Sequence, residues 1–107
     1  MKENDAAWGK FARSKARLIT FPLGQVTATL AAFEAMQWQG ICPMELIRRH
    51  ASGDWGEVMN DRGRERNNIN SKTGLEVVSG YVFSVKNIYI VTKADRSATT
   101  IMLLEEL

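Results

Sequence analysis

The character of the chain changes after residue 74, and this change restricts the fold more than any other feature. The segments 75–83, 87–92 and 99–104 are rich in Val, Ile, Tyr, Phe and Thr, and short polar gaps separate them. Branched and aromatic side chains fit the surface of a β-sheet, and short gaps suit tight connections between antiparallel neighbours. The sequence therefore predicts a meander of three antiparallel strands in this region.

The residues upstream of this region have helical spacing. From Thr29, a suitable N-cap, the apolar residues Leu30, Phe33 and Met36 recur at intervals that would bury one helix face. Trp38 is a further candidate for that face. We therefore expect a first helix over about ten residues.

Two further helices are expected before the strands. Gly40 is a suitable stop for the first helix, and Pro43 suits the first turn of a second helix that runs to residues 48–50. The cationic end of this second helix would interact favourably with the helix dipole. A third, polar helix is expected from Glu57 to about residue 68, with few apolar anchors.

Helices followed by strands predict an α+β fold in which N-terminal helices pack on one face of a three- to four-stranded antiparallel sheet. Residues 18–21 read as a brief strand, which residues 25–27 extend or restart. The side chains expected in the packed layer are Tyr81, Phe83, Ile90 and Met102. Because both faces of the strands are fairly apolar, a homodimer through the open face is a further expectation. We expect residues 18–107 to form a single domain, preceded by a basic extension over residues 1–17.

Composition excludes several classes of protein. A single cysteine and a single histidine provide neither an internal disulfide nor a usual zinc site, so we expect no metal and no cofactor. Cys42, ahead of the second helix, is expected to be a small buried hydrophobe. The polar N-terminus lacks the apolar run of a signal peptide, and no segment approaches the length of a membrane span. We therefore expect a soluble cytoplasmic protein with no membrane partner.

The net charge of +2 is unevenly distributed. Residues 1–17 hold five basic groups against two acidic ones, and they include an amphipathic stretch with Trp8 and Phe11 on one helical face. Charge alone therefore favours at most a local, weak affinity for nucleic acid. The residues expected to contact nucleic acid or a partner are Lys10, Arg13, Lys15, Arg48 and Arg49.

A first polar segment, residues 50–56, allows a structural and a functional interpretation. The spacing of Asp54 and Glu57 is that of a capping box, and the glycines beside them suit a tight turn. Alternatively, His50 would act as a general acid or base, with Asp54 or Asp61 fixing its tautomer. The residues alone leave both interpretations open.

A second polar segment, residues 92–97, falls between two expected strands. Asp95, Arg96 and Ser97 suit a turn in which the arginine points to water. Alternatively, Arg96 with Thr99 and Thr100 would form an edge that binds an anion or a partner. If the two polar segments meet, Arg96 would stabilise negative charge on a phosphate beside His50, which suits metal-independent RNA cleavage.

The combination of these motifs resembles a family of small bacterial proteins. The motifs are residues 49–56, Ser79-x-Tyr81 and residues 90–101, followed by a Leu-Leu-x-Glu-like ending, with Asp61 and Asn67 between them. The family is carried on plasmids, integrative elements and prophages, and its members are commonly labelled plasmid-related or uncharacterised. The resemblance covers about residues 24–107, and the residues that match its pattern are His50, Asp54, Trp55, Asp95 and Arg96.

The resemblance implies a setting on a mobile genetic element. Small proteins of such elements often act against host defence, so the first hypothesis is a non-enzymatic inhibitor of a host defence nucleoprotein complex, of the anti-CRISPR or anti-restriction type. The second is a toxin-like, metal-independent endoribonuclease that uses His50, an acidic partner and Arg96. The third is a regulatory module that binds nucleic acid. The binding residues expected from the two polar segments are His50, Asp54, Trp55, Asp95, Arg96, Thr99 and Thr100.

Overall fold

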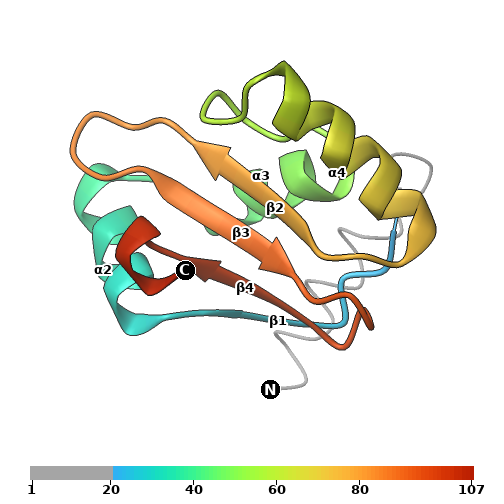
Figure 1. Ribbon diagram of the computed structural model, residues 1–107. Helices are drawn as coiled ribbons and strands as arrows, with labels where there is room; N and C mark the ends of the chain where they lie inside the picture. Colours follow the sequence, from blue (N-terminus) through green and yellow to red (C-terminus); the bar gives the residue numbers. More distant parts are fainter. Residues whose placement is uncertain (1–20) are drawn as a thin grey trace.

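The computed structural model describes residues 21–107, which form an α+β fold of helices followed by strands (Figure 1). The predicted fold class is therefore confirmed. The elements, in chain order, are β1 (Gln25–Ala28), α2 (Leu30–Gln39), α3 (Pro43–Ala51), α4 (Asp61–Thr73), β2 (Val77–Tyr81), β3 (Ile88–Thr92), β4 (Ala98–Met102) and the short 3₁₀ helix η2 (Leu104–Glu106). The expected strand over residues 18–21 falls almost wholly outside the described residues.

The strands form one sheet in the order β1-β4-β3-β2. β2 pairs with β3, and β3 with β4, in antiparallel register, which confirms the predicted meander. β1 pairs with β4 in parallel, with Val26 opposite Thr99, so the sheet is mixed and not wholly antiparallel as expected. A parallel pairing needs a long connection, which α2 and the later elements provide, whereas a short hairpin would have made the two strands antiparallel.

The ends of α2 are those predicted from the sequence, but its buried face is not. Thr29 caps the helix by accepting a hydrogen bond from the Ala32 N–H, and Gly40 ends it in the left-handed region at φ 69°. Met36 is buried as expected, together with Ala32, whereas the other expected core residues are exposed: Leu30 by 72%, Phe33 by 48% and Trp38 by 87%. Apolar side chains occur on all sides of this helix, so their spacing does not identify the buried face. The small residue Ala32 lies on that face.

The third helix begins later than expected. α4 starts at Asp61, and its N-cap Asn60 accepts a hydrogen bond from the Gly63 N–H. The predicted start at Glu57 is wrong because the preceding residues pair with β2: the Gly80 N–H donates to the Trp55 carbonyl, and the Val58 N–H donates to the Gly80 carbonyl. The helix therefore begins only after this segment leaves the sheet edge.

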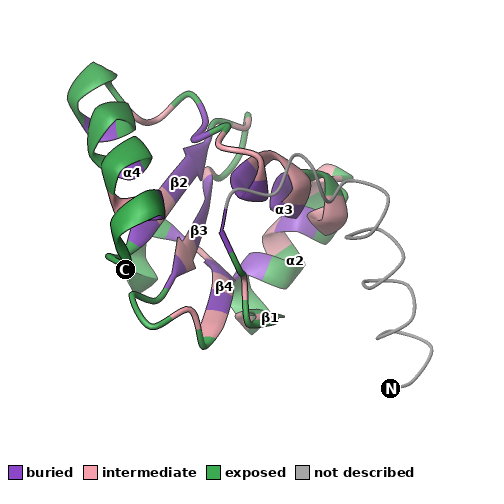
Figure 2. Cartoon of the chain, turned by 90° about the vertical axis from the view of Figure 1, so that its right-hand side faces the viewer, coloured by how far each residue is buried: buried purple, intermediate pink, exposed green. Residues whose placement is uncertain are grey.

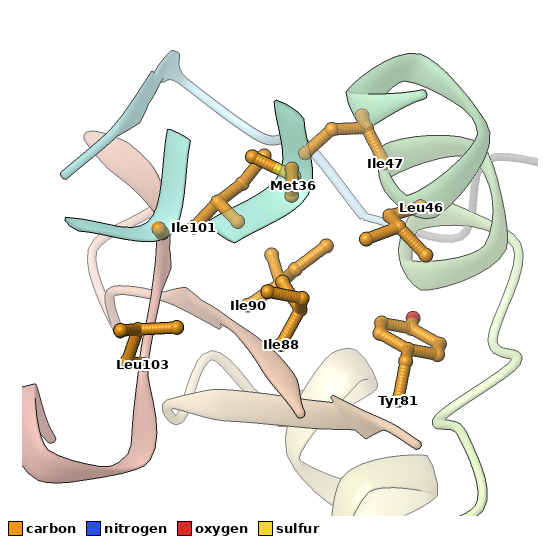
Figure 3. Close-up of a cluster of buried hydrophobic side chains, with 9 residues drawn as sticks. Met36, Leu46, Ile47, Tyr81, Ile88, Ile90, Ile101 and Leu103 are labelled. Carbon is orange, nitrogen blue, oxygen red and sulfur yellow. The ribbon is translucent and has the colours of Figure 1, made fainter. Parts of the chain in front are cut away.

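The main core lies between the sheet and the two helices α2 and α3 (Figure 3), as expected for helices on one sheet face. Its buried members are Ala32, Met36, Leu46, Ile47, Tyr81, Ile88, Ile90, Ile101 and Leu103. Two of the residues expected in this layer, Tyr81 and Ile90, belong to it, and Phe83 packs at its margin. Met102 follows Ile101 along β4 and so faces the opposite side of the sheet.

The helix α4 flanks the outer edge of β2 and contributes no side chain to this core (Figure 2). The Asn67 amide donates to the Val78 carbonyl at 2.7 Å and accepts from the Val78 N–H at 3.2 Å. Together with the two bonds to Gly80, these contacts pair the backbone groups that β2 turns away from β3 at Val78 and Gly80. An edge strand closed in this way cannot pair with another chain there.

Candidate functional site

His50 lies at the centre of the candidate site, on the face of α3 that packs against the sheet. Its side chain is fully buried. The ring nitrogen Nδ1 lies 2.5 Å from the Ser79 hydroxyl of β2, and Nε2 lies 2.8 Å from the Thr92 hydroxyl of β3. Both ring nitrogens are therefore occupied by partners within the fold.

The hydrogen bonds around His50 have one consistent direction. The Thr99 hydroxyl lies 2.6 Å from the Leu23 carbonyl, which only accepts, so Thr99 donates to it. The Thr92 hydroxyl, 2.7 Å from that of Thr99, must then donate to Thr99 and accept from His50 Nε2. His50 is thus inferred to be the neutral tautomer with its proton on Nε2, and its Nδ1 accepts from Ser79.

Aromatic rings close the remaining sides of the imidazole. The Phe21 ring meets the His50 ring edge-on at 5.2 Å, and the Trp55 ring lies at 6.0 Å. Burial, together with the nearby positive charge of Arg96, lowers the pKa of His50 to about 3. His50 is therefore neutral at physiological pH and out of reach of solvent, an environment that does not suit the expected general acid or base.

The acidic residues expected to orient His50 bind arginines instead. Asp54 and Glu57 each accept from the Arg49 guanidinium at 2.7 Å, and Arg49 also lies 4.5 Å above the Tyr81 ring. The hydrogen bond from the Arg49 guanidinium holds the pKa of Glu57 below its usual value. Asp61 lies at the start of α4, 3.4 Å from the guanidinium of an arginine one turn later. The predicted capping box is wrong, because these carboxylates pair with Arg49 and no helix begins at Glu57.

Trp55 and Gly56, at the end of the first polar segment, pack closely against β2. Trp55 is buried, and its indole N–H donates to the Asn68 side chain at 2.9 Å. Gly56 has φ 88°, and a side chain there would overlap the Gly80 carbonyl. A glycine is therefore required at position 56 for both its backbone conformation and its close approach to the strand.

Arg96 has a structural role at the end of α4. Its guanidinium donates to the Asn70 carbonyl at 2.9 Å and to the Leu75 carbonyl at 2.8 Å, and it lies 5.3 Å from the Phe21 ring. These contacts satisfy carbonyl groups at a helix C-terminus, where a positive charge is favourable. Three of the five N–H donors of Arg96 are thus bonded to backbone carbonyls within the fold, the third of them at Lys93.

The neighbours expected around Arg96 do not gather on one edge. Thr99 is buried in the His50 network, and Thr100, the next residue of β4, faces the other side of the sheet. Asp95 accepts from the Ser97 N–H at 3.0 Å, as expected for a turn. The two polar segments do meet, because Phe21 contacts both His50 and Arg96, but the imidazole is enclosed in the core.

A cleft of about 430 Å³ lies between α3 and the connection from β2 to β3. Its lining includes Ile41, Cys42, Leu46, Phe83, Arg48 and Arg49. Cys42 is exposed there, contrary to expectation, because it precedes the first turn of α3. Arg48 pairs with Glu45 at 2.9 Å, and Arg48 and Arg49, two of the residues expected to contact a partner, both line this cleft. The basic residues Lys10, Arg13 and Lys15 lie outside the described residues.

Two exposed apolar residues, Trp38 and Val85, are linked to this cleft through Gln39, although neither of them lines it. Gln39, in the cleft wall, accepts from the Val85 N–H at 3.0 Å and donates to the Lys86 carbonyl at 3.1 Å. These bonds hold the exposed Val85 near the C-terminal end of α2, where Trp38 is also exposed. Sequence reasoning missed this surface because it assigned Trp38 to the core; two residues of helix turn Trp38 well away from buried Met36.

The described residues contain neither a cluster of side chains placed to hold a metal ion nor a helix that could cross a membrane. Within residues 21–107 no group of three or more His, Cys, Asp or Glu side chains is placed to hold a metal ion. Over the same residues, none of the helices has the length and apolar character that crossing a membrane requires.

Comparison with protein-family models, with curated proteins and with solved structures found no match to this chain. The resemblance to a family of mobile-element proteins therefore stays a prediction. The chemistry of the site must be argued from the contacts described above.

Proposed function

We propose that this protein acts by binding a protein partner and not by catalysis. In the setting that the resemblance implies, the partner is a host defence nucleoprotein complex of the CRISPR or restriction type, which the protein inhibits. The observation that carries the proposal is the exposure of Trp38 and Val85 next to Gln39, which lines the cleft that also holds Arg48 and Arg49.

The contacts of the polar segments support a non-enzymatic role. A general acid or base must reach its substrate, and a group that stabilises charge needs free donors. His50 is enclosed, Arg96 is bonded to backbone carbonyls, and Arg49 is bonded to two carboxylates. These three residues therefore stabilise the fold instead of acting on a substrate.

The composition of the surface beside the cleft supports binding to a protein. Tryptophan and arginine are enriched among the residues that dominate protein interfaces, especially around a pocket that excludes water. Trp38 is 87% exposed and Val85 is 68% exposed, so both side chains are accessible to a partner. Arg48 lines the cleft as an ion pair with Glu45, so this surface presents a cation and an anion side by side to a partner.

The proposal is tested by incubating the full chain with purified CRISPR effector ribonucleoproteins and with purified restriction complexes. We expect a stable complex with one class and loss of that complex's activity on DNA. Trp38→Ala should weaken binding about 30-fold, the effect of losing a central contact of about 2 kcal/mol, without lowering the melting temperature. The matched control is Ile69→Ala, which removes an exposed apolar side chain from α4, away from the cleft.

Two outcomes would contradict the proposal. One is the absence of binding to either class at micromolar concentration. The other is RNA cleavage by the wild-type chain that is lost in His50→Gln while the fold persists, which would restore the endoribonuclease hypothesis. Binding to naked nucleic acid that falls steeply with salt would instead favour the regulatory module.

A further inference from the structure

The two edge strands of the sheet differ in whether their outward backbone groups are hydrogen-bonded. At the β2 edge, the outward backbone groups of Val78 and Gly80 are all bonded, by Asn67 of α4 and by the segment that contains Trp55 and Val58. At the other edge, β1 is flanked by no described helix or strand (Figure 1). Within residues 21–107, one edge of the sheet is therefore closed and the other is available for pairing.

The register identifies the backbone groups that β1 leaves free. The Gln25 N–H donates to the Ser97 carbonyl, and the Thr29 N–H donates to the Ile101 carbonyl, so odd-numbered residues face β4. Val26 and Ala28 therefore direct their N–H and C=O groups outward. Among residues 21–107, no hydrogen bond reaches these outward groups.

The spacing of these free groups is self-complementary. If two copies of β1 run antiparallel about a twofold axis at Thr27, Val26 of one copy lies opposite Ala28 of the other. Each such pair exchanges two backbone hydrogen bonds, so the strand pairing forms four bonds in total. The result is a continuous eight-stranded sheet with no exposed β1 edge.

The charge of this region also fits a second copy. In a symmetric contact, side chains near the axis meet their own equivalents, so any charge there would face a like charge. Residues 21–33, which contain β1 and the first turn of α2, carry no charged side chain. Leu30 and Phe33 follow β1 directly and are exposed, so they provide apolar flanks on both sides of the axis.

We infer that β1 is a dimer interface that pairs with β1 of a second copy of this chain. This contact lies at a sheet edge and not on the open sheet face that the sequence suggested. No residue of β1 lines the cleft beside α3, so the dimer and the proposed function are independent.

The test is the molar mass of the full chain in solution, measured by sedimentation over a range of concentrations. We expect the wild type to reach twice the chain mass. Thr27→Lys should weaken the dimer about tenfold or more, because two lysines then face each other across the axis. Ala28→Pro should act similarly, because it removes one outward N–H from each copy and no bond within the monomer. The matched control is Ser84→Lys, which adds the same charge to an exposed loop and should leave the dimer intact.

A second measurement needs no variant. Amide hydrogen exchange at Val26 and Ala28 should slow as the wild-type concentration rises, since the dimer protects both groups. A wild type that remains monomeric at the highest concentration would overturn the inference and leave the edge to a strand from another protein. A dimer that persists in both β1 variants would also overturn it.

Discussion

The enclosed, neutral state of His50 predicts a loss of stability in mild acid. The pKa of His50 is about 3 in the fold, against about 6.5 in an unfolded chain. Because the unfolded chain takes up a proton that the folded chain cannot, the contribution of His50 to the free energy of unfolding falls as the pH drops below 6.5. Above pH 7 this contribution is nearly constant. The fall continues until the pH approaches 3, where the folded form also takes up the proton.

The size of the effect follows from this difference in pKa. Between pH 7 and pH 5 the loss is about 2 kcal/mol, and around pH 5 the slope approaches about 1.4 kcal/mol per pH unit, which corresponds to one proton. For a domain whose total stability is about 5–15 kcal/mol, this is a large fraction. The chain has one histidine, so no other side chain of this type titrates in the same interval.

The assay is urea unfolding at several pH values from 7.5 to 4.5. The matched variant is His50→Gln, whose amide donates and accepts hydrogen bonds but takes up no proton. Carboxylates such as Glu57, whose pKa Arg49 lowers, titrate mainly below this window and are common to both proteins. We expect stability to fall between pH 6.5 and 5 in the wild type and to stay nearly flat in the variant. Parallel curves for the two proteins would refute the reasoning.

Two substitutions test the contacts that dock the polar segments on β2. Gly56→Ala should cost about 3 kcal/mol or more, since the new side chain overlaps the strand, whereas Gly74→Ala has the same sign of φ and open space and should cost only about 1–2 kcal/mol. Equal losses in urea unfolding would show that overlap is unimportant. Asn67→Ala should cost about 2–4 kcal/mol and speed hydrogen exchange at Val78, because two edge groups lose their partner. The control Arg66→Ala, on the exposed side of α4, should change the free energy of unfolding by less than about 0.5 kcal/mol. If Asn67→Ala and Arg66→Ala lost similar stability, the contact of Asn67 with the β2 edge would not be the cause of the loss.

The elements that the sequence predicted well are those set by local chemistry. The cap at Thr29, the stop at Gly40, the start at Pro43 and the three strands of the meander depend on residues close in sequence, and the structure has all of them. The start of α4 was missed because the preceding residues pair with β2, more than twenty residues away. Such a contact overrides the local capping signal of Glu57.

The candidate site was harder to predict because chemical type does not reveal burial. A histidine near carboxylates suggests proton transfer, but the partners of His50 are the hydroxyls of Ser79 and Thr92, 29 and 42 residues away. One signal was present in the sequence: Ser79, Thr92 and Thr99 each stand two positions from a large apolar residue of the same strand, and therefore on the face that such residues bury. Polar residues at such positions need a buried partner, and the only histidine was a candidate for it.

The residues that match the family pattern are largely those that hold the two polar segments to the core. Phe21 lies between His50 and Arg96 and stacks on Trp55, so one ring links α3, the end of α4 and the segment before β4. A fully bonded polar centre of this kind fixes one arrangement of helix and strands, whereas an apolar centre would allow others. The matching residues are then a requirement of the fold, and related chains with different partners would retain them. If the proposed function holds, the surface that selects a partner should therefore differ among such chains, and we expect the exposed positions of Trp38 and Val85 to vary among them.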